Sequence, residues 1–176
     1  IEGTLEPELM FKLAKRNNIK IPFKNISDVK SAYNFSNLES FLKIFYQGSN
    51  VLIKEEDFFD LTWAYALKCK KDNVVHTEIF FDPQTHVNRG IHFEVIINGI
   101  YKALVKANKE FGLTSKIIMC FLRDLDEKSA FEILDQALVH KDKIIAVGLD
   151  SSELNNPPRK VERVFKKAIE NNFLTV

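Results

Sequence analysis

In the first part of the chain, apolar residues recur every three or four positions, which is the period of an amphipathic helix. This period predicts a helix over residues 5–17, with Thr4 as its N-cap and Pro7 in its first turn. It predicts two more helices, over residues 36–48 and 55–71. This part of the chain is therefore expected to be mainly helical.

The segment between the first two predicted helices lacks such a period. Residues 18–35 are broken by Pro22 and are rich in Asn and Ser, so we expect them to form a loop. The helix after them is expected to begin at Ser36, because Glu39 stands three residues later and completes a capping box.

From residue 74 onward the pattern changes to short runs of apolar and β-branched residues. These runs predict strands over residues 74–81, 115–122 and 143–149. Helical patterns follow each run, over residues 92–111, 130–141 and 160–172. The first of these helices should end at Gly112, and the last four residues, "FLTV", have the composition of the start of another strand.

Strand, loop and helix alternate strictly in this second part, which indicates a parallel sheet with crossover helices. A doubly wound sheet and a (β/α)8 barrel both fit this order. No GxGxxG follows any strand, which disfavours a dinucleotide-binding sheet. In both architectures functional side chains lie where strands end. In this sequence those places are the loops 82–90, 123–129 and 150–159.

Charge and cysteine content narrow the function further. The 25 basic and 24 acidic residues leave a net charge of +1, without the electrostatic footprint of a nucleic-acid-binding protein. No apolar run approaches the length of a membrane span, so neither a nucleic acid nor a membrane is an expected partner. Cys69 and Cys120 lie far apart without metal-binding spacing, which predicts reduced, buried thiols and favours a cytoplasmic protein.

Four stretches along the chain, "IEGTLEPELMF", "LTWAY", "EIFFDPQTH" and "VGLDSSE…NPP", resemble the adenosine/adenine deaminase family of zinc-dependent hydrolases. The third and fourth are similar to the adenine deaminase branch, which acts on the free base. The resemblance implies a (β/α)8 TIM-type barrel and zinc-dependent hydrolysis of adenine to hypoxanthine and ammonia in purine salvage. The alternatives are an adenosine deaminase within the family and, outside it, a non-catalytic (β/α) domain that binds a purine or a protein.

The resemblance also implies that residues 1–176 are one partial barrel domain, with strands two to four, the start of strand five and the surrounding helices. In the family a His-x-His pair before "IEGT" and a His-Ala-Gly-Glu segment after "FLTV" carry zinc ligands and the catalytic Glu. Strand one, the C-terminal strands, the zinc ligands and the catalytic residues are therefore expected outside this chain. The sequence leaves the oligomeric state open.

Four candidate substrate-binding residues lie in the helical part. By resemblance, Glu2, beside Gly3, stands where adenosine-specific relatives have an Asp that contacts ribose, and its longer side chain can fill the ribose space. The alternative is a carboxylate that stabilises the dipole of the following helix. Phe41 and Phe45 share one helix face, and the resemblance makes that helix a hydrophobic lid over the purine. Packing in the core is the equally supported alternative.

Two further candidates follow strands. Ser151 stands where relatives have a Gly whose backbone N–H meets a purine nitrogen, a change that is tolerated if the turn needs no positive φ. For the neighbouring Asp150, loop capping and a site role are equally supported. Asp82 is a candidate for the pocket wall. Together with Gln84 and His86, it is more strongly expected to form a structural loop network than a metal site.

Overall fold

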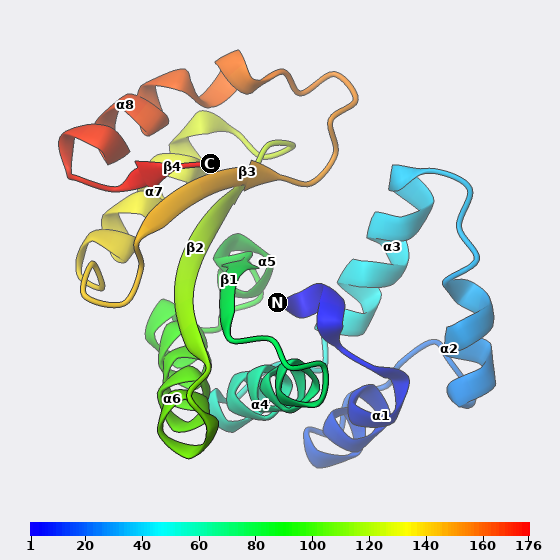
Figure 1. The fold of residues 1–176 in the computed structure, drawn as a ribbon. Helices are drawn as coiled ribbons and strands as arrows, with labels where there is room; N and C mark the ends of the chain where they lie inside the picture. Colours follow the sequence, from blue (N-terminus) through cyan, green and yellow to red (C-terminus); the bar gives the residue numbers. More distant parts are fainter.

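The computed structural model describes residues 1–176 and shows a helical part followed by a sheet with crossover helices (Figure 1). The helical part consists of η1 (Glu2–Thr4), α1 (Pro7–Arg16), α2 (Ile26–Ala32), α3 (Leu38–Ser49) and α4 (Glu55–Lys71). The sheet part consists of β1 (His76–Phe81), α5 (Pro83–Val87), α6 (Phe93–Phe111), β2 (Thr114–Leu122), α7 (Glu127–Leu138), β3 (Ala146–Asp150), η2 (Pro158–Val161), α8 (Glu162–Glu170) and β4 (Leu174–Thr175).

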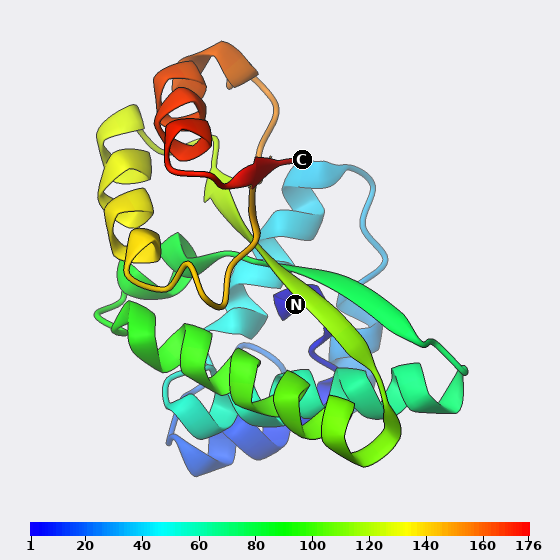
Figure 2. The same cartoon turned by 60° about the vertical axis from the view of Figure 1, so that its left-hand side comes forward.

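The four strands pair in sequence order, β1-β2-β3-β4, and every pair is parallel. The connecting helices α6, α7 and α8 all lie on the convex side of the curved sheet (Figures 1 and 2). A doubly wound sheet would place helices on both faces. The strand order and the one-sided helices are those of part of a (β/α) barrel, so the fold prediction is confirmed.

The hydrophobic core lies between the sheet and the helices on its convex side and continues among the helices of the first part of the chain. Alternate strand residues such as Ile79, Phe81 and Met119 point into a cluster of 29 buried residues. Helix α6 crosses α4 closely at Gly99, where an added Cβ would lie 2.4 Å from the carbonyl oxygen of Glu55. Only glycine at this position allows the two helices to pack this closely. None of the helices combines the length and apolarity that crossing a membrane requires.

The two longest helices agree with the sequence predictions, whereas α7 begins and ends three residues earlier than predicted. Helix α4 has the predicted bounds, Glu55–Lys71. Helix α6 ends at Gly112, which has a left-handed φ of 76° and donates its N–H to Asn108. This geometry is that of a glycine C-cap, which residues with a Cβ adopt at a cost. "FLTV" contributes β4, as expected.

The two predicted N-caps, Thr4 and Ser36, are wrong. Helix α1 begins after Glu6, and the Thr4 hydroxyl instead donates to the carbonyl of Ile1 within η1. Helix α3 is capped by Asn37, whose side chain accepts the N–H of Ser40, in place of the predicted box of Ser36 and Glu39. The sequence offers several competent caps in a row, because Asn and Ser cap helices about equally well.

Two short helices lie in predicted loops. Helix α2 lies within the predicted loop 18–35, begins after Asn25, which accepts the N–H of Asp28, and buries only Val29. Helix α5 has five residues and follows Asp82 directly. Elements this short show no periodic apolar pattern, so the sequence could not distinguish them from turns.

Candidate functional site

A cavity of about 510 Å³ lies at the carboxyl ends of β1 and β3, between the sheet and helix α3. All six predicted substrate-binding residues contribute to its lining. They are Glu2, Gly3, Phe41, Phe45, Asp82 and Ser151. Contact with a substrate stays a prediction for each of them, but the structure brings them to one place.

A second, larger cavity of about 720 Å³ lies at the opposite ends of the strands. It includes Lys116, Lys141 and Lys143, which stand at the amino ends of β2 and β3. Sites in parallel α/β sheets form at the carboxyl ends, where the loops converge. Of these two cavities, the smaller lies at the carboxyl ends and is lined by buried acidic side chains. We therefore take the smaller cavity as the candidate site.

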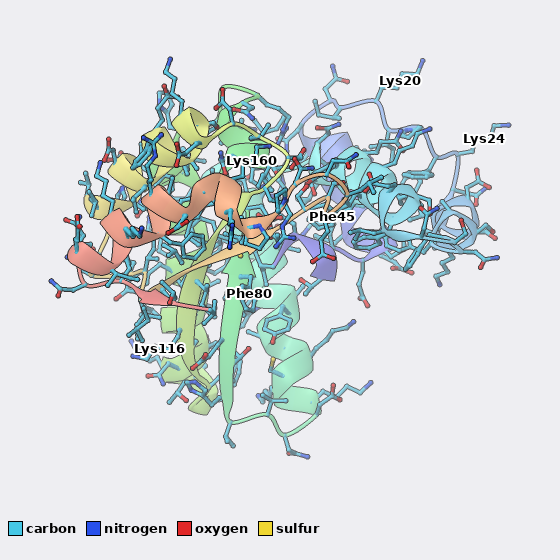
Figure 3. All side chains as sticks on the ribbon, turned by 90° about the horizontal axis from the view of Figure 1, so that it is seen from above. Lys20, Lys24, Phe45, Phe80, Lys116 and Lys160 are labelled. Carbon is cyan, nitrogen blue, oxygen red and sulfur yellow. The ribbon has the colours of Figure 1, made fainter.

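Aromatic rings form one wall of this cavity. The rings of Phe41 and Phe45 on α3 have centroids 5.8 Å apart, and Tyr46 meets Phe45 edge to face at 5.2 Å. Phe80 of β1 contributes from the sheet, and both it and Phe45 are labelled in Figure 3. Phe41 and Phe45 do not belong to the buried core. Their arrangement suits contact with a flat apolar ring.

A buried acidic cluster forms the floor. Successive strand residues alternate between faces, so Asp82 after β1, Cys120 in β2 and Asp150 at the end of β3 share the concave face. One polar atom from each lies within 4.8 Å of the other two. Gly148 makes this possible, because a Cβ there would lie 3.0 Å from the sulfur of Cys120. Sequence reasoning missed the cluster as a unit.

The side chains of the acidic cluster have raised pKa values and therefore favour their protonated forms. Burial raises the pKa of Asp82 well above its usual value, and the nearby charges of Glu2 and Asp150 raise it further. Burial likewise raises the pKa of Asp150 and of the Cys120 thiol. Two carboxyl groups this close cannot both ionise cheaply, so the pair retains a proton and the thiol stays neutral.

Glu2 is 3% exposed and is held by Asp82 and by helix α5 after β1. Its Oε1 accepts hydrogen bonds from His86 Nε2 at 2.9 Å and from the backbone N–H of Asp82 at 3.3 Å. Burial lowers the pKa of His86, so the ring is neutral and its Nδ1 accepts from Arg89 at 2.8 Å. These bonds give Glu2 a structural task, and its predicted contact with the ribose space stays a prediction.

The loop network predicted for Asp82, Gln84 and His86 is partly confirmed. Gln84 donates to the Ser129 hydroxyl at 2.7 Å and accepts the backbone N–H of Leu122 at 2.9 Å. His86 is bonded to Glu2, as described above. Gln84 and His86 are therefore structural, whereas the carboxyl group of Asp82 lines the cavity.

Ser151 contradicts the condition under which its prediction was made. It has φ of 73°, so the turn does need the left-handed conformation that favours glycine. Its hydroxyl lies 2.7 Å from that of Tyr46, a hydrogen bond that joins β3 to α3 across the cavity. We attribute the tolerance of this conformation to that bond.

The loop after β3 is anchored by charged side chains. Arg123 pairs with Glu153 at 3.2 Å. Lys160, labelled in Figure 3, donates to the carbonyl oxygens of Arg123 and Asp124 at 2.9 and 3.2 Å. The loops that follow β2 and β3 are thereby held together at the rim of the cavity.

Asp82, Cys120 and Asp150 are the group that could hold a metal ion, and they do not fit a catalytic zinc centre. Catalytic zinc is usually bound by histidines and retains an open position, and its thiol and carboxyl ligands must lose their protons. None of the four histidines of the chain belongs to the group, and its three side chains have raised pKa values.

Comparisons with known proteins agree with this geometry. The family model described as "Adenosine deaminase" matches residues 1–176. The adenine deaminase of Psychrobacter cryohalolentis is 64% identical over 176 residues, which are 100% of this chain and 53% of that protein. The chain thus spans about half the length of the curated relatives it matches.

Two solved structures share the fold. The crystal structure of adenine deaminase from Arthrobacter aurescens superposes with a TM-score of 0.95 at 43% identity, covering 99% of this chain and 53% of that one. An amidohydrolase from Burkhoderia ambifaria, solved with bound Zn, superposes with a TM-score of 0.87 at 22% identity, covering 99% of this chain and 48% of that one.

Proposed function

The chain belongs to the adenosine deaminase family, and on that premise we propose that it forms part of an enzyme that hydrolyses adenine to hypoxanthine and ammonia. The observation that carries this proposal is the similarity along the entire chain, cavity included, to proteins named adenine deaminase. We further propose that residues 1–176 are one part of a single barrel domain whose remaining strands lie outside this segment.

The shape and chemistry of the cavity support a purine substrate. Its volume of about 510 Å³ lies in the range of small-molecule sites. A purine is flat and apolar on its faces, which matches the wall of Phe41 and Phe45, and polar at its edges, which matches Asp82 and Asp150 on the floor. The substrate is expected to lie with one face on the α3 rings.

Zinc is part of this proposal only for the intact protein. An amidohydrolase of the same fold was solved with bound Zn. Residues 1–176 offer no donor set that fits such a centre, so we expect its ligands to come from outside this segment. The part of the site described above would then bind and orient the base rather than activate water.

We also propose that the enzyme acts in cytoplasmic purine salvage. Cys69 and Cys120 are both free and buried, which suits a reducing compartment.

Turnover by the natural protein that contains residues 1–176 tests the activity. With zinc supplied, we expect ammonia release from adenine and far less from adenosine. Binding of adenine without ammonia release would support the non-catalytic alternative instead. A higher kcat/KM for adenosine than for adenine would identify the other branch of the family.

The substitution Glu2→Asp tests whether Glu2 excludes the nucleoside. Shortening the side chain should open space for a ribose, and a difference of one methylene is worth about 1–3 kcal/mol of discrimination. The ratio of kcat/KM for adenine over adenosine is therefore expected to fall. An unchanged ratio would leave Glu2 with its structural role only.

A further inference from the structure

We propose that Asp82 and Asp150 together recognise the N3/N9–H edge of the unsubstituted base and so select free adenine over its nucleoside. This inference rests on the proposed function, because it assigns a specificity role within that same cavity. It concerns two residues at the carboxyl ends of β1 and β3 that act as one hydrogen-bonding surface.

The first support is unused hydrogen-bonding capacity. Asp82 is only 7% exposed, and the side-chain partner of its carboxyl group is Asp150. Asp150 has Asp82 and the Cys120 thiol as its partners, and its Oδ1 is fully enclosed without any hydrogen bond. Buried carboxyl groups normally receive several N–H or O–H donors. Here the missing partners would come from the cavity, which both residues line.

The second support is the chemistry of a carboxyl pair that shares one proton. Burial raises the pKa of both groups, and the nearby charge of Glu2 raises both further. Asp150 raises the pKa of Asp82 in addition, so one O–H donor and one oxygen acceptor stand side by side. The other titratable groups facing the pair are Glu2, Cys120, Tyr46 of α3 and the amino group of Ile1. The thiol is kept neutral by burial, so it does not compete for the proton.

A free purine presents the complementary pattern. N9–H is a donor and the neighbouring N3 is an acceptor on the same edge, opposite the reacting carbon C6. An N9 substituent removes the donor and places bulk against the buried pair. A site built to pair with a substrate N–H strongly rejects an analogue that lacks it, because the buried polar group is left without a partner.

Binding to the natural protein tests this proposal without any substitution. We expect adenine to bind at least about 100-fold more tightly than 9-methyladenine, and more tightly than 3-deazaadenine, in calorimetric titrations of the metal-depleted protein, which binds adenine without turning it over. Equal affinity for the three bases would overturn the proposal even if the protein deaminates adenine. Absence of ammonia release from adenine would instead overturn the proposed function.

Substitutions then assign the effect to the pair. Asp82→Ala and Asp150→Ala should each weaken adenine binding about 10- to 100-fold and leave 9-methyladenine within about twofold. Asp82→Asn should retain most of the preference, because an amide beside Asp150 still offers one donor and one acceptor. The matched control is Asp124→Ala, an exposed acid after β2, which should change neither affinity.

Two results would overturn the assignment. One is an unchanged preference for adenine over 9-methyladenine in both alanine variants, with circular dichroism showing folded protein. The other is a loss of bound zinc in Asp82→Ala or Asp150→Ala but not in Asp124→Ala, which would make the pair metal ligands. If the alanine variants do not fold, the three-base titration of the unsubstituted protein still decides the question.

Discussion

His86 is a buried histidine that lies between the carboxylate of Glu2 and the guanidinium group of Arg89. Its two ring nitrogens contact Glu2 and Arg89, and its ring meets Phe58 edge to face at 4.8 Å. Arg89 in turn donates to the carbonyl oxygens of Ser49, the last residue of α3, and of Leu52 after it. This chain of hydrogen bonds ties η1, α5 and α3 together behind the cavity.

Replacing His86 should therefore destabilise the fold. His86→Ala removes the side-chain donor to the buried carboxylate of Glu2 and the acceptor of Arg89. Leaving a buried polar group unpaired in this way costs about 1–3 kcal/mol. Urea denaturation of the natural protein measures the change. His76→Ala is the matched control, because His76 lies exposed at the start of β1 and should cost less than about 0.5 kcal/mol. Equal losses for the two variants would contradict the network.

The acid pair makes stability depend on pH in a defined direction. An exposed Asp has a pKa of 3.8, and the pKa values of Asp82 and Asp150 are higher than this in the folded protein. The folded protein therefore binds more protons than the unfolded chain. Their stabilising contribution is complete below 3.8 and is lost as pH rises through the raised values.

Asp82→Asn should remove most of this dependence. Between about pH 4 and about pH 8, the free energy of unfolding of the variant is expected to rise relative to that of the unsubstituted protein. Denaturation at a series of pH values measures the difference. A gap between the two proteins that stays constant across this range would show that Asp82 titrates normally.

At the scale of elements, α3 differs from the other long helices in what its apolar face does. Leu42 is buried, whereas Phe41 and Phe45 are partly exposed at the cavity and lie outside the core. Helices α4 and α6 bury their apolar residues against each other and the sheet. Helix α3 therefore contributes more to the wall of the site than to the core.

Phe45→Ala should separate substrate binding from stability. Loss of a ring that stacks on a base costs about 1–3 kcal/mol, so KM for adenine is expected to rise about tenfold or more. Phe58→Ala is the contrasting control, because Phe58 is 0% exposed and its truncation should cost about 3–5 kcal/mol of stability. A Phe45→Ala variant that loses stability but keeps its KM would place the ring in the core.

At the scale of the whole molecule, the sheet of residues 1–176 has open edges at β1 and β4. Phe80 on its concave face is 46% exposed, and Leu174 and Val176 at the second edge are 60% and 63% exposed. A closed barrel would pair these edges and fill this face. Open edges and apolar patches promote association.

Residues 1–176 taken by themselves are therefore expected to keep helical content but to associate and to lack a cooperative unfolding transition of a monomer. Sedimentation and calorimetry of the isolated segment check both points. Elemental analysis of the same sample should find no stoichiometric zinc. A single sharp transition from a monomeric species would show that the segment is a self-sufficient domain.

The sequence determined what depends on neighbouring residues. Helices α4 and α6, the Gly112 stop and the order of strands followed from local periodicity and turn chemistry, because these preferences act over a few residues. The family resemblance placed six residues in a site, and all six line one cavity. The sequence did not predict the short helices α2 and α5. Helix α2 buries a single residue and α5 has only five residues, so neither shows a periodic apolar pattern.

Only the tertiary structure decided which distant residues meet. Strand register and the alternation of side chains place Asp82, Cys120 and Asp150 on one face of the sheet. The register between strands cannot be read from the order of residues along the chain. The positive φ of Ser151 and its hydrogen bond to Tyr46 of another element likewise could not be read along the chain. A sequence specifies local conformation directly, but contacts between strands depend on the free energy of the whole packed sheet.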